Sequence, residues 1–369
     1  MKKITLEVLR KIHEYGYEAY AVGGFVRDML LNIKSNDIDL TTNATPMELK
    51  NIFVDIKIRK ENYGSVTLIY KNVRFEITTY RKEANYVDNR HPEKIEYVND
   101  LKTDLLRRDF TINTICMDKD GNIIDLLNGI NDLEKKVIKT VNDANKSFQD
   151  DSLRILRAIR FATILDFELS NKVILAIENN KHLLKKLSYE RKKYELDHIF
   201  TSKNVKKGVF LLEKFDLLKI LEIENISRVK DYSDLIGIWA MINSNEYNFT
   251  NSEKELIKNI NIVYELDNLS KQVLYKYGLY VNVLAGLNKG LSKKKIIEIY
   301  QNLPIQRRDD IKINALKICE ILNRKPDYLI NEIYNDLEDK IINGNLLNEE
   351  ECIINYIVNK YKDLVVLNN

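Results

Sequence analysis

Glycine, proline and long apolar runs are all scarce in this chain. Only 12 glycines and 4 prolines occur in 369 residues, which disfavours elaborate loops and favours a mostly helical body. No stretch approaches the roughly 20 uninterrupted apolar residues of a membrane span, so we expect no membrane association. The N-terminus, MKKITLEVLRKIHEYGYEAY, has two lysines but no apolar signal core. These absences disfavour a membrane or secreted protein and predict a cytoplasmic one.

Cysteine and net charge are also low. Cys116, Cys319 and Cys352 are far apart, with neither a C-x-x-C pair nor a zinc spacing, which predicts reduced thiols. The net charge of +3 is mild, so a nucleic-acid surface must come from locally grouped basic side chains. A length of 369 residues, 44% of them apolar, predicts two to four subdomains.

The apolar pattern changes once along the chain. Residues 20–140 are rich in short strand-like segments, including a hairpin of 65–70 and 73–79 that turns at Asn72. From about Leu133 onward the apolar spacing is helical. This order predicts an α+β fold in which a small sheet domain precedes a long helical part.

The segment Ala19–Thr42, AYAVGGFVRDMLLNIKSNDIDLTT, combines features that suit a nucleotide site. A short apolar strand ends at Gly23-Gly24, and a helix follows; glycines at such a place let a triphosphate approach backbone N–H groups. Asp37 and Asp39 are two residues apart, so on a strand they share one face and repel unless a cation such as Mg²⁺ lies between them. A lone Gly-Gly is usually a turn, and a lone Asp-x-Asp a solvated loop. Together, in this order, they predict a nucleotidyltransferase palm.

Glu76 is a third acid on a neighbouring predicted strand. Its alternation with Phe75 and Ile77 places it on the opposite face from those core residues. Beside the two aspartates it could complete a metal cage or orient the attacking hydroxyl. A cross-strand ion pair with a basic neighbour explains Glu76 equally well, so both interpretations stay open.

A second motif, LRRDFTIN, covers residues 106–113. The planar guanidinium of arginine matches phosphate oxygens with two parallel hydrogen bonds. Arg107 and Arg108, together with Asp109 and Asn113, therefore suit the phosphates and ribose hydroxyls of a nucleotide.

A third motif, DDSLRILRAIRF, covers residues 150–161. On a helix, one acid and three arginines that recur every three residues drift slowly around one side; they are Asp151, Arg154, Arg157 and Arg160. A surface helix with ordinary ion pairs is the alternative, but aligned arginines repel each other unless something anionic is near. An Asp–Arg pair can also read a base, because cytosine and adenine present an amino donor beside a ring-nitrogen acceptor. Uracil and guanine present the reverse order and leave buried groups unpaired, at a cost of ~1–3 kcal/mol each.

These motifs resemble the class II tRNA nucleotidyltransferase / poly(A) polymerase family. The likeness rests on GGFVRDMLL…DIDLTT, RRDFTIN, DLLNGINDL, DDSLRILRAIRF and SYERKKYEL, in that order, and the tail is similar to that of bacterial CCA-adding enzymes. The resemblance implies a small mixed-sheet palm, the head, followed by an elongated helical neck, body and tail. We therefore expect a head at 1–135, a neck with base-recognition helices at 136–200, a body at 201–270 and a tRNA-binding tail at 271–369.

The resemblance also implies roles for single residues. Mg²⁺ would be held by Asp37 and Asp39. The other implied positions are Gly24, Arg27 and Arg108 at the triphosphate; Asp151 and Arg154 at the base; Arg157 and Arg160 in support of them; and Glu190 and Arg191, which brace the neck helix. From the motifs themselves, Glu76 is predicted as a third catalytic acid, and Gly23, Asp109 and Asn113 as supporting residues. The chain departs from the family at Asp150, where Glu is usual, and at Asp327, where Gly is usual.

The implied activity is addition of C, C and A to the 3′ end of tRNA from CTP and ATP, without a nucleic-acid template. Two Mg²⁺ ions at Asp37 and Asp39 would activate the 3′-hydroxyl and stabilise the leaving pyrophosphate. Residues 82–98 are polar, lack a long periodic pattern and are predicted to be a mobile loop that reshapes the pocket as the primer grows. A poly(A) polymerase and an A-only adding enzyme of the same family are the alternatives. No oligomeric state is predicted.

Overall fold

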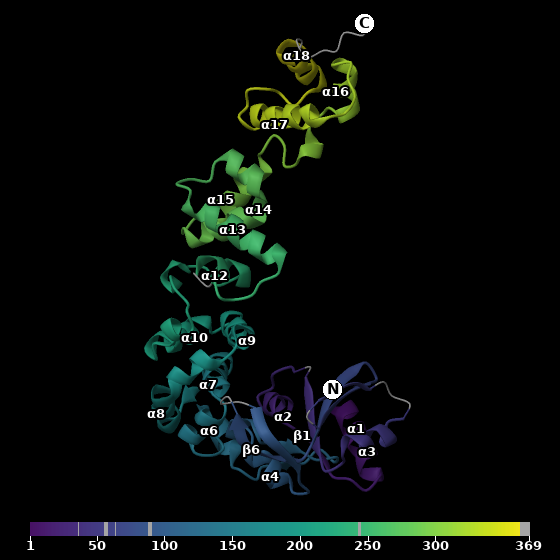
Figure 1. Cartoon of the computed structure of the whole chain (residues 1–369), viewed down its shortest axis with the longest axis vertical. Helices are drawn as coiled ribbons and strands as arrows, with labels where there is room; N and C mark the ends of the chain where they lie inside the picture. Colours follow the sequence, from purple (N-terminus) through teal and green to yellow (C-terminus); the bar gives the residue numbers. More distant parts are fainter. Residues whose placement is uncertain (36, 55–57, 63, 88–90, 243–244, 362–369) are drawn as a thin grey trace. The chain divides into compact units, whose positions relative to one another are not determined.

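The chain forms two compact units, residues 1–222 and 223–369, in a computed structural model (Figure 1). The structure describes residues 1–35, 37–54, 58–62, 64–87, 91–242 and 245–361. None of the described helices is long and apolar enough to cross a membrane. The finer division at residues 135, 200 and 270 stays a prediction.

A seven-stranded mixed sheet is the centre of the first unit, in the order β3-β4-β5-β2-β1-β8-β9. Its strands are β1 (Ala19–Val22), β2 (Ile38–Thr42), β3 (Ile58–Asn62), β4 (Ser65–Tyr70), β5 (Val73–Thr79), β8 (Cys116–Met117) and β9 (Ile123–Ile124). β2 and β5 run parallel, and the other neighbouring pairs run antiparallel. The predicted mixed sheet is confirmed.

Local sequence explains how the chain turns between these strands. Lys71 and Asn72 have φ of 48° and 62°, as a two-residue type I′ turn requires, so the hairpin predicted at Asn72 is confirmed. Between β2 and β3 lies α3 (Pro46–Ile52), which begins with a capping box between Thr45 and Glu48.

Residues 82–98 do not form the predicted loop. β6 (Arg81–Val87) and β7 (His91–Tyr97) pair antiparallel as a separate two-stranded sheet, and residues 88–90 lie outside the described residues. The prediction was wrong because these strands are rich in polar residues, so the alternation of apolar and polar residues by which a half-buried strand is recognised is weak.

Apart from the β6–β7 hairpin and one short strand pair, the remaining elements of the first unit are helices, which come before, between and after the strands of the seven-stranded sheet in the sequence. They are α1 (Lys2–Glu14), α2 (Gly24–Leu30), α4 (Leu101–Leu106), α5 (Gly129–Glu134), α6 (Ala144–Asp150), α7 (Leu153–Leu165), α8 (Asn171–Asn180), α9 (Tyr189–Phe200), α10 (Val205–Lys214) and α11 (Leu217–Ile220), with short 3₁₀ helices η1 (Thr111–Asn113) and η2 (Lys181–Lys186) and a parallel bridge of β10 (Val137–Ile138) with β11 (Glu168–Leu169). α7 packs against α9 and α10, and its Ile155, Leu156 and Ile159 are fully buried.

The described part of the second unit is helical (Figure 1). Its elements are η3 (Ile226–Arg228), α12 (Leu235–Met241), α13 (Asn251–Glu265), α14 (Lys271–Asn288), α15 (Lys293–Gln301), η4 (Arg308–Asp310), α16 (Ala315–Ile321), α17 (Tyr328–Ile342) and α18 (Glu350–Tyr361). α13 and α15 pack on α14, and α16 packs on α17 and α18. The predicted change from a sheet domain to helices, and with it the α+β fold class, is confirmed.

Candidate active site

A cleft of about 830 Å³ in the first unit gathers most of the predicted site residues. Its walls come from β2, β5, α2, α7 and α9 and from the segment between α4 and η1. The predicted residues that line it are Gly23, Gly24, Arg27, Asp37, Asp39, Glu76, Arg108, Asp109, Asn113, Arg157 and Arg160. The predicted residues that do not line it are Asp151, Arg154, Glu190 and Arg191.

Three carboxylates, those of Asp37, Asp39 and Glu76, line the cleft. Parallel pairing of β2 with β5 puts Asp39 opposite Glu76 in register, and exposed Asp37 immediately precedes β2. Ile38, between the two aspartates, is 2% exposed and anchors the strand in the core as predicted. Glu76 makes no ion pair with a described residue. The sheet therefore presents the three acids together to the cleft.

Burial raises the pKa of Asp39; the Arg108 guanidinium opposes this rise, and the carboxylates of Glu76 and Asp37 add to it. Among the described residues, no three Asp, Glu, His or Cys side chains are grouped closely enough to hold a metal ion. A divalent ion at Asp37 and Asp39 would therefore need further oxygen ligands from water and from nucleotide phosphates, which is how proteins commonly bind Mg²⁺.

The glycine turn comes close to this carboxylate group. Gly23 has φ of 78° and precedes α2, a conformation that favours glycine. A Cβ atom at Gly23 would lie 3.4 Å from Asp39 Oδ2 and 3.7 Å from an Arg108 terminal nitrogen. The absence of a side chain thus leaves space beside the carboxylates and beside a guanidinium.

Arg107 and Arg108 are held by a buried acid, Asp104. Arg107 Nε lies 2.9 Å from Asp104 Oδ1, and an Arg108 terminal nitrogen lies 3.4 Å from Oδ2. Burial alone would raise the pKa of the Asp104 carboxyl, but the two guanidinium groups hold it below its usual value. Arg108 Nε is buried and has no hydrogen-bond partner in the described part of the chain.

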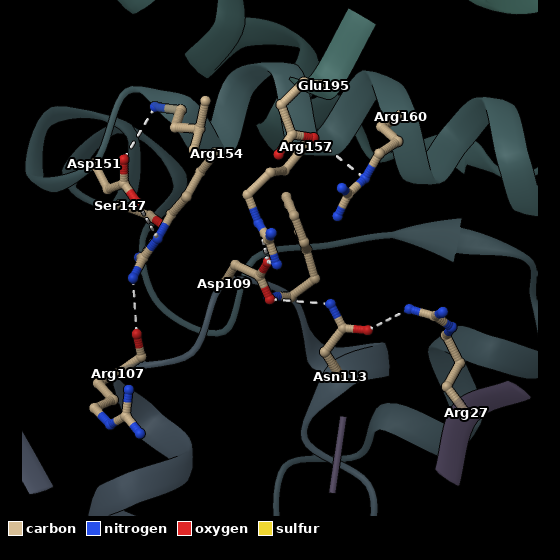
Figure 2. A network of polar contacts seen from close by, with 12 residues as sticks. Arg27, Arg107, Asp109, Asn113, Ser147, Asp151, Arg154, Arg157, Arg160 and Glu195 are labelled. Atoms are coloured by element: carbon tan, nitrogen blue, oxygen red, sulfur yellow. Dashed lines mark hydrogen bonds and ion pairs between the residues drawn. The ribbon is translucent and has the colours of Figure 1, made fainter. Parts of the chain in front are cut away.

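A polar chain crosses the cleft from α7 to α2 (Figure 2). Arg157 Nε donates to Asp109 Oδ2 at 2.8 Å, Asn113 Nδ2 donates to Asp109 Oδ1 at 3.0 Å, and Arg27 donates to Asn113 Oδ1 at 2.7 Å. The Asp109 carboxylate also accepts from the backbone N–H of Phe110 at 2.8 Å. Burial would raise the pKa of Asp109, but Arg157 and Asn113 hold it well below its usual range.

Arg154 and Asp151 lie beside the cleft, next to Arg107. Arg154 donates to Ser147 Oγ and to the Arg107 carbonyl, each at 2.8 Å, and its Nε lies 4.0 Å from Asp151 Oδ2 (Figure 2). Asp151 accepts from the backbone N–H of Leu153 at 3.1 Å. The predicted base-reading pair is therefore engaged with the protein itself.

Arg160 pairs with a buried acid on α9. Its Nε lies 3.2 Å from Glu195 Oε2, and its guanidinium lies over the ring of Phe161 at 4.7 Å. Burial raises the pKa of Glu195, and Arg160 opposes that rise. Glu190 is exposed, and neither it nor Arg191 has a side-chain polar contact with a described residue, so their bracing role stays a prediction.

Comparison with known proteins identifies the family. Residues 19–139 match the family described as "Poly A polymerase head domain", residues 166–226 match "Probable RNA and SrmB- binding site of polymerase A", and residues 245–357 match "tRNA nucleotidyltransferase domain 2 putative". The chain is 34% identical to the CCA-adding enzyme of Ligilactobacillus salivarius, with 95% of each chain covered. It is 33% identical to that of Lactococcus lactis subsp. lactis, with 94% of each covered. The chain belongs to the CCA-adding enzyme family.

Solved CCA-adding enzymes share its fold. The Bacillus stearothermophilus enzyme in complex with CTP has a TM-score of 0.82 at 24% identity and covers 97% of both chains. The Thermotoga maritima enzyme complexed with tRNA has a TM-score of 0.70 at 23% identity, covering 97% of this chain and 94% of that one. Both likenesses extend over the sheet domain and the helices that follow.

Three residues of this CCA-adding family member escaped the sequence prediction. Asp104 positions the two adjacent arginines, Glu195 pairs with Arg160, and Tyr194 lines the cleft near α7. Asp104 precedes Arg108 by one helical turn, so an i,i+4 ion pair was a signal available in the sequence. Tyr194 and Glu195 lie within the quoted motif SYERKKYEL, but nothing in the sequence shows that Glu195 pairs with Arg160, because Arg160 belongs to another helix.

Proposed function

We propose that this chain is a tRNA nucleotidyltransferase that adds C, C and A to the 3′ end of tRNA from CTP and ATP, without a nucleic-acid template. The observation that carries this proposal is the pairing of Asp39 with Glu76 in register, in a cleft that also contains Gly23 and Arg108. Similarity to CCA-adding enzymes over about the whole chain favours this activity over poly(A) synthesis. Its substrates, tRNA and nucleoside triphosphates, support a place of action in the cytoplasm.

Nucleotidyltransferases of this family are generally metal-dependent, and we propose Mg²⁺ as the ion. Asp37 and Asp39 offer hard carboxylate oxygens; burial, and then the nearby carboxylates of Glu76 and Asp37, raise the pKa of Asp39, and a cation there would offset both effects. Bound at these residues, Mg²⁺ would lower the pKa of the RNA 3′-hydroxyl and offset the charge of the triphosphate.

The side chains around Gly23 suit a triphosphate. The space left by Gly23 adjoins the Arg108 guanidinium, whose buried Nε has no partner among the described residues. A phosphate oxygen beside Gly23 would accept a charge-assisted hydrogen bond from the terminal nitrogen of Arg108 that borders this space. Arg27, held in place by Asp28 and Asn113, supplies a second fixed positive charge to the same wall.

Base selection is assigned to Asp151 and Arg154. Their carboxylate and guanidinium would accept from the amino group and donate to the ring nitrogen of cytosine or adenine. Arg154 donates to Ser147 and to the Arg107 carbonyl, which hold the guanidinium in place and leave further N–H donors for a base. Arg157 and Arg160, fixed by Asp109 and Glu195, would support the base from the same helix.

The test uses tRNA transcripts that end at the discriminator base, at C or at CC, each incubated with one NTP at a time. We expect CTP to extend the first two, ATP to extend the third, and addition to stop at CCA. An Asp39→Asn variant is the control for contaminating activity. Continued A addition to any RNA would assign a poly(A) polymerase instead, and A addition to CC ends without any C addition would assign an A-only enzyme.

A further inference from the structure

A second pocket, of about 460 Å³, lies in the second unit, whereas the catalytic carboxylates belong to the first unit. One wall is aromatic: the Trp239 ring lies 5.0 Å from the ring of Tyr247 and 5.4 Å from that of Phe249. Trp239 and Tyr247 are almost completely buried, whereas Phe249 is half-buried. The pocket therefore has a rigid apolar floor with one more accessible aromatic ring.

One face of α13 also lines the pocket. Lys254, Ile257, Lys258 and Asn261 recur along the helix at the spacing that brings side chains to the same side. Both lysines are exposed, and neither forms an ion pair with a described residue. Two ammonium groups one helical turn apart repel each other, so an anion between them is favoured.

Lys254 and Lys258 give this pocket positive charge, whereas the charges of Arg228 and Glu265 in its lining offset each other. Among the described residues that line it, Glu265 is the one acid, and it forms an ion pair with Arg228, with Nη1 3.0 Å from Oε1. An anion near Lys254 and Lys258 therefore meets no unpaired carboxylate among the described lining residues. A ligand that fits has a negative group and a flat or apolar group beside it.

We propose that this pocket binds one nucleotide of the RNA substrate, with a backbone phosphate between Lys254 and Lys258 and its nucleoside against Phe249. The inference rests on the proposed function, because that function supplies an RNA as the ligand. A nucleotide within an RNA chain has a single phosphate charge beside a flat base, which matches two lysines and an aromatic wall. A free triphosphate fits less well, since the described residues that line the pocket include no group of carboxylates to hold its metal ion.

Trp239 provides a direct readout, because it is the only tryptophan in the chain. With excitation at 295 nm, saturating tRNA should change its emission. CTP with Mg²⁺, which is proposed to bind in the first unit, should leave the emission unchanged when added without RNA. The same titrations give the Kd for tRNA and its dependence on salt.

The variant Lys254→Gln/Lys258→Gln removes the charge, and Lys254→Arg/Lys258→Arg retains it as the matched control. For the glutamine variant we expect tRNA binding about fivefold weaker near 0.15 M salt, and a slope of log K against log salt reduced by about 1, as for the loss of one phosphate contact. The rate of CCA addition at saturating tRNA should be unchanged, and the arginine variant should behave like the unmodified chain.

Two outcomes separate this inference from the proposed function. If CCA addition proceeds but tRNA leaves Trp239 emission unchanged, or the glutamine variant keeps the same Kd and salt slope, the pocket does not bind RNA while the function stands. If the unmodified chain neither binds tRNA nor extends it, the proposed function fails, and the RNA assignment of the pocket fails with it.

Discussion

Replacing Asp109 by asparagine should destabilise the first unit by about 3 kcal/mol at neutral pH. Asparagine keeps an oxygen for the N–H of Phe110 and for Asn113, but it turns an NH₂ group toward Arg157. The variant therefore loses the bonds that Arg157 makes to Asp109 Oδ2, from Nε at 2.8 Å and from a terminal nitrogen at 2.6 Å.

The magnitude follows from the burial of the two partners. Removing one member of a buried ion pair costs about 3–5 kcal/mol. Asp109 is 8% exposed, but the Arg157 side chain is 31% exposed and recovers part of its hydration, so the lower end of that range applies.

The pH dependence of this effect has a definite sign. The pKa of Asp109 is lowered in the folded state, so its contribution to stability is complete above the unfolded pKa, about 3.9, and is lost as the pH falls through the folded value. The stability difference between the two proteins should therefore be constant from about pH 5 to 7 and narrow below about pH 4.

Urea unfolding followed by far-UV circular dichroism measures both effects. Hydrogen exchange at the Phe110 amide reports on the site itself, because that N–H donates to the replaced group. The reasoning would be refuted if the free energies of unfolding of the two proteins differed by less than about 1 kcal/mol at pH 7, or if their difference did not decrease below about pH 4.

Three further predictions concern the metal site, the base-reading pair and helix α5. Asp39→Asn should reduce nucleotide incorporation with Mg²⁺ below detection in a gel assay, and EDTA should do the same to the unmodified chain until Mg²⁺ is restored; retained activity would remove Asp39 from the metal site. Asp151→Ala with Arg154→Ala should raise UTP incorporation relative to CTP, and unchanged rejection of UTP would contradict base reading by this pair. Gly129→Ala should lower the thermal unfolding midpoint by the equivalent of about 1–3 kcal/mol, since its Cβ would lie 2.3 Å from the carbonyl oxygen of Thr111; an unshifted midpoint would show that the backbone yields freely.

Local patterns predicted the elements of the fold better than their pairing. The turn at Asn72 and the change to helical spacing are written in neighbouring residues, and both are confirmed. The parallel pairing of Asp39 with Glu76 depends on strands that are separated in sequence by α3, β3 and β4, so the sequence predicted only neighbouring strands and not their register. Residues 82–98 were mistaken for a loop because the apolar alternation of a half-buried strand is weak in them.

The residues of the site that the sequence missed are acids that act from helices. Asp104 on α4 and Glu195 on α9 lie within helices, where an acid is usually part of a solvated face. Both are instead buried, at 0% and 1% exposure, because each is paired with arginine inside the site. Only tertiary packing distinguishes such an acid from a surface one.

The arginines of the third motif show where spacing succeeds and where it fails. α7 begins at Leu153, and Asp151 before it is extended, with φ of −139° and ψ of 100°, so the helical relation predicted between Asp151 and Arg154 does not hold. Within the helix the spacing does hold, and successive arginines reach different partners: Arg157 meets Asp109, and Arg160 meets Glu195. The repulsion between the arginines, which suggested a bound anion, is thus offset by two carboxylates of the protein itself. The argument for a nucleotide therefore rests on the acids at Asp39 and Glu76 and on the Arg108 guanidinium beside Gly23, rather than on the alignment of arginines.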